Sequence, residues 1–125
     1  MSTSRALLGD WGEDAIEKFL ERQGCQIVDR KYRCRWGEID LVVRDGEELV
    51  FIEVRTRRGK LFGTPQESIT EAEAERMIET CRDYLENRVG ENAHVETNWR
   101  IDLVSVYPSR GRGPRIDHLR RAVEL

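Results

Sequence analysis

The sequence has few of the residues that stabilise small proteins through cross-links or bound zinc. It contains only three cysteines and two histidines among its 125 residues. An odd number of widely spaced cysteines argues against a disulfide framework, and the absence of a Cys-x-x-Cys pair argues against a zinc site. We therefore expect Cys25, Cys34 and Cys81 to be buried or half-buried free thiols.

Long hydrophobic runs are also lacking. No apolar stretch approaches the ~20 residues that span a bilayer, and the N-terminal stretch MSTSRALLGDWGED has no apolar segment of the secretory type. Hydrophobic residues make up 38% of the chain and charged residues 36%. We expect a cytoplasmic protein without membrane contacts, built as a single domain over residues 1–125 in which 1–3 and 109–114 are flexible.

Positive charge is not in excess, but it is concentrated. The net charge of −3 alone disfavours a nucleic-acid-binding protein. However, 13 of the 21 basic residues fall in three clusters, so the local field can differ from the net charge. The clusters are Arg30, Lys31, Arg33 and Arg35; Arg55, Arg57, Arg58 and Lys60; and Arg110, Arg112, Arg115, Arg120 and Arg121. Each cluster is either ordinary solvated surface or a phosphate-binding site.

Hydrophobic periodicity predicts two helices and at least four strands. The expected elements are a helix over Ser4–Gln23, strands over Gln26–Arg33, Gly37–Arg44 and Glu48–Thr56, a helix from the Thr70 region to about Gly90, and a strand over Thr97–Tyr107. The segment Arg115–Ala122 is either a short final strand or a tail. The order α-β-β-β-α-β indicates an α/β domain with a mixed sheet flanked by helices.

Two carboxylates, Asp40 and Glu53, interrupt the apolar runs of the expected hairpin. Side chains alternate between the two faces of a strand, so both carboxylates share a face if the loop has an even number of residues. A two-residue turn at Asp45-Gly46 makes them diagonal neighbours, whereas a four-residue loop over Asp45–Glu48 places them directly opposite each other.

The other face of this hairpin must then belong to the core, because it is wholly aliphatic. It consists of Ile39, Leu41, Val43, Val50, Ile52 and Val54. Like charges that face each other are destabilising, so the acidic pair needs an arginine, a raised pKa or a cation. The pair is either an ion-paired surface or a divalent-metal site, since magnesium prefers carboxylate and water oxygens.

Glu13 borders the apolar stripe of the first helix, three residues before Ile16 and seven before Leu20. A carboxylate in this position approaches the sheet rather than bulk water. The neighbouring Gly12 permits close packing of the helix on a strand. The alternative is a boundary glutamate whose only role is solubility.

A helix glutamate, then an aspartate, then Glu-x-Lys or a variant about a dozen residues later, resembles the PD-(D/E)XK nuclease core. More closely, GEDAIEKFLERQGCQIVDRKYRCRWGEIDLVVRDGEELVFIEVRTR resembles the YraN-type family of small bacterial proteins, which is thought to be related to Holliday-junction resolvases and restriction endonucleases. The resemblance continues through FGTPQESIT, Tyr84-Leu85 and RIDLVSV, so it covers nearly the whole chain. It implies a restriction endonuclease-like α/β fold and binding of nucleic acid.

The resemblance also implies roles for individual residues. The implied catalytic residues are Glu13, Asp40, Glu53, Arg55 and Gln66. The implied ligands of Mg²⁺ or Mn²⁺ are Asp40, Glu53 and the backbone carbonyl of Val54. The implied nucleic-acid-binding residues are Arg30, Lys31, Arg33, Arg35, Arg57, Arg58, Lys60, Arg110 and Arg112.

The chain departs from the family pattern at two positions. Arg55 stands where the family usually has a lysine, and Glu73 stands where a lysine is frequent. Arginine stays protonated, so Arg55 can stabilise phosphate charge but cannot act as a general base.

Three functions remain open on the sequence. The first is a magnesium-dependent phosphodiester hydrolase acting on DNA, with branched DNA among the substrates. The second is a non-catalytic module that binds DNA or RNA through the basic clusters, and the third is a protein-interaction domain that uses the acidic second helix. A homodimer is compatible with the resemblance, because resolvase-like relatives often act as dimers.

Overall fold

The computed structural model describes residues 3–57, 69–108, 111 and 113–125, with side chains from residue 12 onward. Its elements are the helix α1 (Thr3–Arg22), the strands β1 (Gln26–Cys34), β2 (Gly37–Asp45) and β3 (Glu48–Thr56), the helix α2 (Glu71–Tyr84), the π-helical turn η2 (Leu85–Val89), the short helix α3 (Ala93–Glu96), and the strands β4 (Trp99–Tyr107) and β5 (Arg115–Val123). None of the helices in these ranges is long and apolar enough to cross a bilayer.

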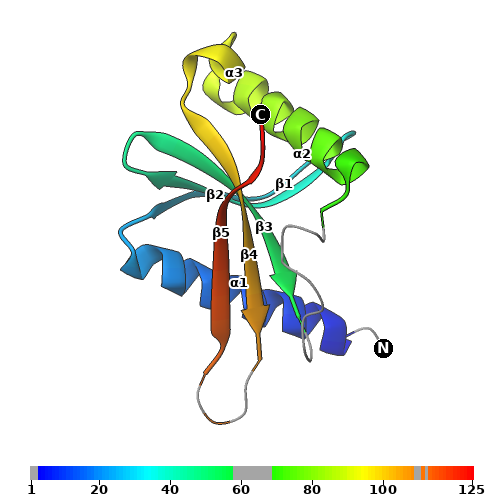
Figure 1. Ribbon diagram of the computed structural model, residues 1–125, viewed down its shortest axis with the longest axis vertical. Coiled ribbons are helices and arrows are strands. Elements are labelled where there is room, and N and C mark those ends of the chain that lie inside the picture. Colours follow the sequence, from blue (N-terminus) through cyan, green and yellow to red (C-terminus); the bar gives the residue numbers. More distant parts are fainter. Residues whose placement is uncertain (1–2, 58–68, 109–110, 112) are drawn as a thin grey trace.

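The five strands form one mixed sheet in the order β1-β2-β3-β4-β5 (Figure 1). β3 and β4 are parallel, and the other neighbours are antiparallel. A parallel pair needs a long crossover connection, and the chain through α2 supplies it. The expected α/β domain with a mixed sheet flanked by helices is confirmed. The C-terminal segment forms a strand rather than a tail, while α3 was not predicted.

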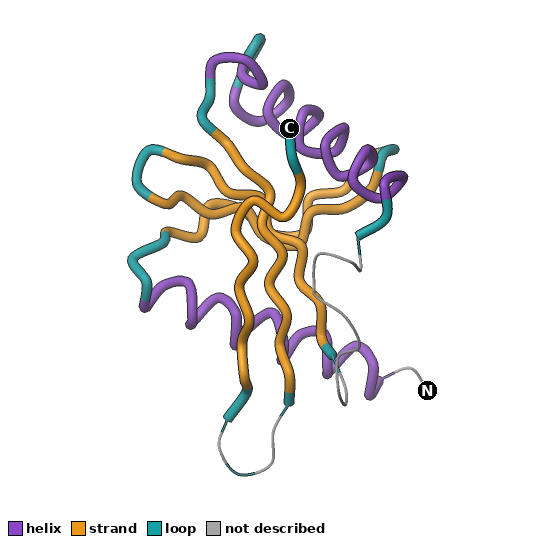
Figure 2. Tube along the Cα trace, in the orientation of Figure 1, coloured by secondary structure: helices purple, strands orange, loops and turns teal. Residues whose placement is uncertain are grey.

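The two faces of the sheet are covered by different helices (Figure 2). On one face, Ile16 and Leu20 of α1 pack against the aliphatic side chains Leu41, Val43, Val50, Ile52, Val104 and Val106. On the other, Cys81 and Leu85 pack against Val42, Leu49, Phe51 and Ile101. The expected aliphatic core face is therefore real, but the opposite face is core as well.

Ile39 is an exception to the predicted face pattern. It joins the cluster under α2 instead of the cluster under α1. Its partner across the β1–β2 ladder, Tyr32, packs in the same cluster. The strict alternation expected from the sequence does not extend to this end of β2, where Lys31 on the paired strand takes a φ of +51° between the pairs Arg30–Leu41 and Tyr32–Ile39.

The β2–β3 turn is not the two-residue turn at Asp45-Gly46 that the sequence offered as one alternative. Asp45 pairs with Glu48, so the turn residues are Gly46 and Glu47. Gly46 takes a φ of +63°, which favours glycine at a turn position. Arg100 of β4 holds the last pair of the ladder, with Nη2 3.1 Å from Asp45 and Nη1 2.5 Å from Glu48. The strand pairing is therefore the one expected for the longer loop.

Gly12 allows α1 to lie directly on the sheet, as the sequence predicted. A Cβ atom at this position would lie 2.6 Å from Thr56 Oγ1 and 3.1 Å from Val106 Cγ1. Both distances are too short for ordinary packing, so a larger residue would push the helix away. The close approach brings Glu13, the next residue of α1, toward the sheet.

Candidate functional site

Asp40 of β2 and Glu53 of β3 lie at the same level of the sheet. The β2–β3 ladder ends at the pair of Leu41 and Ile52, and Asp40 and Glu53 are the next residues of the two strands. Asp40 Oδ2 accepts a 2.7 Å hydrogen bond from the backbone N–H of Val54. This bond fixes the Asp40 carboxylate against β3, and both acids are half-buried.

Burial raises the pKa of both carboxyl groups. The pKa of Asp40 is about 6, because burial raises it, the hydrogen bond from Val54 opposes that rise, and the charges of Glu13 and Glu38 add to it. The pKa of Glu53 is about 7, for which burial is the largest cause and the charge of Asp40 is the second. Two half-buried acids whose pKa values are raised towards neutrality favour the binding of a proton or of a cation.

The acids around this pair are neutralised by basic side chains. The outer ion pairs are Glu13 with Lys31 at 3.6 Å, Glu38 with Arg33 at 3.2 Å, and Glu73 with Arg55 at 2.9 Å. Among the side chains that the structure describes, Asp40 and Glu53 form no such ion pair. Within the described residues, the inner pair therefore lacks a direct salt bridge, and the nearby positive charges of Lys31 and Arg55 only partly oppose the rise of the two pKa values.

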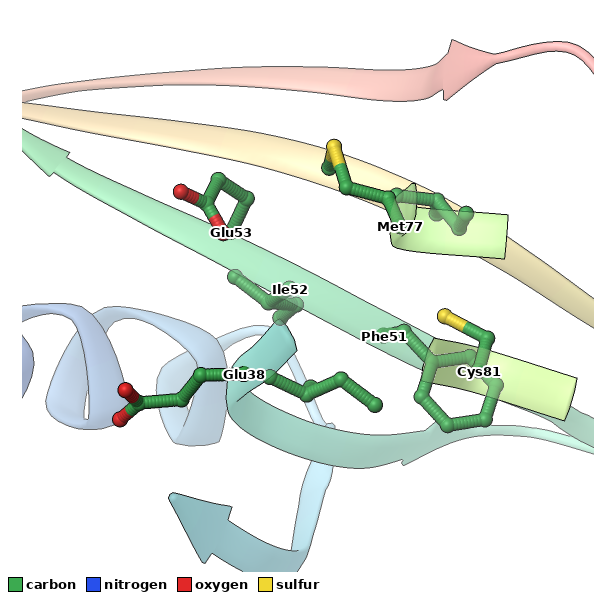
Figure 3. Close-up of a pocket in the computed structure, with 8 residues that line it drawn as sticks. Glu38, Phe51, Ile52, Glu53, Met77 and Cys81 are labelled. Carbon is green, nitrogen blue, oxygen red and sulfur yellow. The ribbon is translucent and has the colours of Figure 1, made fainter. Parts of the chain in front are cut away.

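A narrow pocket extends from Glu53 between the sheet and α2 (Figure 3). The carboxylates of Glu38 and Glu53 lie at one end, and Phe51 and Cys81 lie toward the other. Met77 and Cys81 of α2 form part of its apolar lining. The interior has room for about one water molecule. This apolar surface explains why burial dominates the pKa of Glu53.

The donor set suits a hard divalent cation. Magnesium sites commonly use one or two protein carboxylates and complete the shell with water and substrate phosphate. Asp40, Glu53 and the carbonyl of Val54 would supply oxygen ligands of this kind. Within residues 12–57, 69–108 and 113–125, no group of three or more His, Cys, Asp or Glu side chains is arranged to hold a metal. A metal ion bound at this position would therefore have two carboxylate ligands, Asp40 and Glu53.

Arg55 belongs to the edge of the same site. It lies two residues after Glu53 on β3, hence on the same face, and its positive charge lowers the pKa of Glu53 while burial raises it. Its partner Glu73 is placed by the start of α2, where the hydroxyl of Thr70 accepts a 3.1 Å hydrogen bond from the Glu73 backbone N–H. The two departures from the family pattern are thus the two members of one ion pair.

Most residues of the first basic cluster also have acidic partners. Arg30 binds Glu17 of α1 with its closest contact at 2.6 Å, while Lys31 and Arg33 bind Glu13 and Glu38. Arg35 differs, because its guanidinium lies 4.4 Å from the ring centre of Trp36. The sequence analysis did not single out Trp36, although an aromatic residue beside a basic cluster was a visible signal.

The other predicted binding residues are only partly described. Arg57 lies just beyond β3, where its backbone N–H donates to the carbonyl of Val106. Arg115 and Arg121 of the third cluster pair with Asp117 and Glu48. Predicted residues that lie outside the described ranges are Arg58, Lys60, Gln66, Arg110 and Arg112.

A buried ionic network was missed by the sequence analysis. The fully buried carboxylate of Asp102 accepts hydrogen bonds from Arg100 Nε at 3.0 Å and from the backbone N–H of Arg121 at 3.0 Å, and it contacts His118 Nε2 at 2.7 Å. The signal was the pair of charged residues in the otherwise apolar stretch RIDLVSV. Because these groups satisfy one another, the network serves to fasten β5 to β4.

The fold and the site define a single-sheet α/β protein with a half-buried acidic pair on its neighbouring strands β2 and β3. Residues 12–106 match the family described as "Uncharacterised protein family UPF0102". The chain belongs to this family, which confirms the YraN-type resemblance.

Relatives from several bacteria match along nearly the whole chain. A "UPF0102 protein" of Pelotomaculum thermopropionicum is 41% identical over 98% of this chain and 99% of its own length. A "UPF0102 protein" of Roseiflexus castenholzii is 42% identical over 99% of this chain and 98% of its own length. Among solved structures, SfsA of Pyrococcus furiosus in complex with Ca²⁺ aligns with a TM-score of 0.43 and 17% identity over 97% of this chain and 65% of that chain. This TM-score is too low to establish a common fold.

Proposed function

We propose that this protein is a nucleic-acid-binding phosphodiester hydrolase of restriction endonuclease-like fold that acts on DNA. Asp40, Glu53 and the Val54 carbonyl are the proposed ligands of Mg²⁺ or Mn²⁺. The observation that carries the proposal is the isolation of the inner acids. Each of three neighbouring acids has a salt-bridge partner, whereas among the described groups neither Asp40 nor Glu53 has one, and Asp40 accepts only the hydrogen bond from the N–H of Val54.

Burying two carboxylates without a salt bridge costs stability, which a purely structural site has no reason to bear. Perturbed acids in a recess are typical of functional sites. Here the recess is the pocket beneath Glu53. Burial raises the pKa of the Glu53 carboxyl group to about 7. A divalent cation would offset the charge of both acids at once.

The residues around the pair have distinct proposed roles. A bound metal would supply Lewis-acid polarisation of a phosphate oxygen and a bound water of lowered pKa. Arg55 would stabilise negative charge that develops on the phosphate. Glu13, held by Lys31 at the edge of α1, would orient groups that approach Asp40 from the helix side.

The direct test is metal-dependent cleavage of a panel of end-labelled single-stranded, duplex and four-way branched DNA. Cleavage should require Mg²⁺ or Mn²⁺ and be lost in Glu53→Ala. The matched control is Glu47→Ala, which removes an exposed acid from the turn of the same hairpin. Equal cleavage by Glu53→Ala and the control would refute the proposed site. Binding of DNA without cleavage in either Mg²⁺ or Mn²⁺ would refute hydrolysis and favour the non-catalytic binding module.

Binding is tested separately through its dependence on salt. For duplex DNA, log affinity falls by about 0.9 per phosphate contact for each unit of log salt. Substituting Arg57 and Arg58 together by glutamine should weaken binding and reduce this slope. Arg82→Gln is a matched control, since it removes an arginine that pairs with Glu79 on the surface of α2. If the double variant and the control give the parental slope, the second basic cluster does not contact phosphate.

A further inference from the structure

The turn between β1 and β2 carries an aromatic side chain that packing does not explain. Trp36 is 37% exposed, and among the described side chains it is the only aromatic residue in the group of large exposed hydrophobics. The others in that group are Val28, Val89, Val95 and Leu125. Trp36 therefore offers a flat apolar surface to solvent.

Arg35 contacts the ring of Trp36 rather than pairing with an acidic side chain. Its guanidinium lies 4.4 Å from the ring centre of Trp36, within the range of a cation–π contact. The three other members of the first basic cluster are paired with Glu17, Glu13 and Glu38. Among the described side chains Arg35 has no carboxylate partner, so its charge stays available beside the ring.

The turn is held firmly in place. Cys34 pairs with Gly37 at the end of the β1–β2 ladder, and Arg33 bridges to Glu38 across it at 3.2 Å. Gly37 lies against α2, since a Cβ atom there would come 3.2 Å from the Oγ1 of the buried Thr80. Trp36 is thus presented by a braced turn rather than by a free loop, which lowers the entropy cost of using it as a binding surface.

The turn also leads directly into the acidic site. Trp36 precedes Asp40 by four residues, and β2 begins at Gly37. At about 3.3 Å per residue of strand, the two backbones are about 13 Å apart. This distance corresponds to about four nucleotides at the 3.4 Å spacing of one DNA strand. A strand bound at the acidic pair would therefore reach the turn within a few nucleotides.

We infer that Trp36, backed by Arg35, is a stacking platform for an unpaired base a few nucleotides from the acidic pair. The preferred substrates then have unstacked bases, such as single strands or the exposed ends and junctions of branched DNA, rather than continuous duplex. Aromatic side chains stack on any base, and Arg35 adds attraction for the adjoining phosphate. The inference rests on the proposed function, because it needs a nucleic acid at Asp40 and Glu53.

The test compares affinities by fluorescence anisotropy in EDTA, which prevents cleavage. The probes are a labelled oligothymidylate 20-mer and a blunt duplex of 20 base pairs. Both are several times longer than the stretch of about four nucleotides between the turn and the acidic pair. The variants are Trp36→Ala, Trp36→Phe and, as a matched control, Val95→Ala, which shortens another exposed apolar side chain in α3. Circular dichroism confirms that each variant is folded.

Trp36→Ala should weaken binding of the single strand about 5- to 150-fold, the range that loss of one stacked base predicts. Binding of the duplex should stay the same, and Trp36→Phe should retain most of the affinity. Tryptophan fluorescence should be quenched on binding in the parent protein but much less in Trp36→Ala.

Two results would overturn the inference while leaving the proposed function intact. One is an equal loss for both probes in Trp36→Ala, and the other is no loss for either probe. If the folded parent protein binds neither probe, either in EDTA or in Mg²⁺, nucleic-acid binding itself is refuted, and the platform is refuted with it.

Discussion

Arg55 Nη2 lies 2.9 Å from Glu73 Oε2, which joins β3 to the first turn of α2 beside the acidic pair. In the family pattern both positions commonly carry lysine. The ion pair shows how this chain keeps the local charge balanced while it differs at both positions.

The first prediction concerns replacing Arg55 and Glu73 by the lysines of the family pattern. In Arg55→Lys the new lysine would face Glu73, and a neighbouring negative charge keeps a lysine protonated. The single variant should therefore cleave little faster than the parent. The double variant Arg55→Lys with Glu73→Lys removes that charge and should cleave at least about 10²-fold faster, the lower end of the 10²–10⁴-fold that general-base assistance contributes.

Single-turnover cleavage at saturating protein and equal Mg²⁺ measures this effect. Glu73→Lys alone is the control for added positive charge near the substrate. If it accelerates cleavage as much as the double variant does, the gain comes from binding or electrostatics and not from the lysine at position 55.

The second prediction concerns the pH dependence of folding. Burial raises the pKa of Glu53 from its ordinary 4.5 to about 7, so the folded state binds this proton more tightly than the unfolded state. Stability should fall as the pH rises from about 4.5 through 7. Glu53→Gln removes the titration, and in metal-free buffer it should reduce the loss between pH 5 and 8.5 by about 1–3 kcal/mol.

Urea unfolding at the two pH values, with EDTA present, gives the free energies. Glu47→Gln, an exposed acid of the same hairpin, should leave the difference between the two pH values unchanged. An unaltered pH dependence in Glu53→Gln would mean that the carboxyl group of Glu53 has an ordinary pKa.

The third prediction concerns the contact between α1 and β3. Gly12→Ala places a Cβ 2.6 Å from Thr56 Oγ1, so it should destabilise the protein even though alanine favours helix. Overpacking of this kind costs about 1–3 kcal/mol. Adding Thr56→Ala removes the oxygen and should recover most of the loss.

A double-mutant cycle by urea unfolding measures the coupling. Thr56→Ala alone should be only mildly destabilising. If the two substitutions are additive, the strain arises elsewhere, and Val106, whose Cγ1 lies 3.1 Å from the same point, becomes the better partner to vary.

The fourth prediction concerns the buried Asp102. Burial would raise its pKa, but hydrogen bonds from His118, Arg100 and the Arg121 N–H lower it below 3.8. Its contribution to stability is therefore present above pH ~3.8 and is lost as the pH falls further. Asp102→Ala should cost about 3–5 kcal/mol near neutral pH, because it leaves Arg100 buried with one partner fewer.

Asp117→Ala is the matched control, since it removes an acid from an exposed pair with Arg115 on β5. Such a pair contributes about 0–1 kcal/mol. A loss in Asp102→Ala as small as in the control would show that the network does not fasten β5.

Local sequence patterns were sufficient for most elements of this fold. The alternation of apolar residues predicted β3 with its observed bounds, Glu48–Thr56, and a stripe at helical spacing predicted α2 together with the π-helical turn that follows it. The close packing at Gly12 was also predicted. The helix and the strand depend on neighbours a few residues apart, whose geometry follows from their periods, whereas Gly12 only permitted a close approach whose partners, Thr56 and Val106, lie far away in the sequence.

Hairpin register and ionic partners depended on contacts between distant parts of the chain. Two registers were compatible with the alternation of Asp40 and Glu53, and Arg100 of β4 holds the observed one through Asp45 and Glu48. His118 has no partner near it in the sequence, yet it meets Asp102 across a ladder.

The site shows the same division. The sequence alone placed Asp40 and Glu53 on one face of a hairpin, because a strand repeats every two residues. Only the folded chain decided that Arg55 meets Glu73, that neighbouring acids are neutralised by Lys31 and other basic residues, and that the inner two are left without such partners among the described side chains. The physical reason is that charge compensation acts over a few ångströms of space, and the packing of α1 and α2 on the sheet sets which side chains come that close.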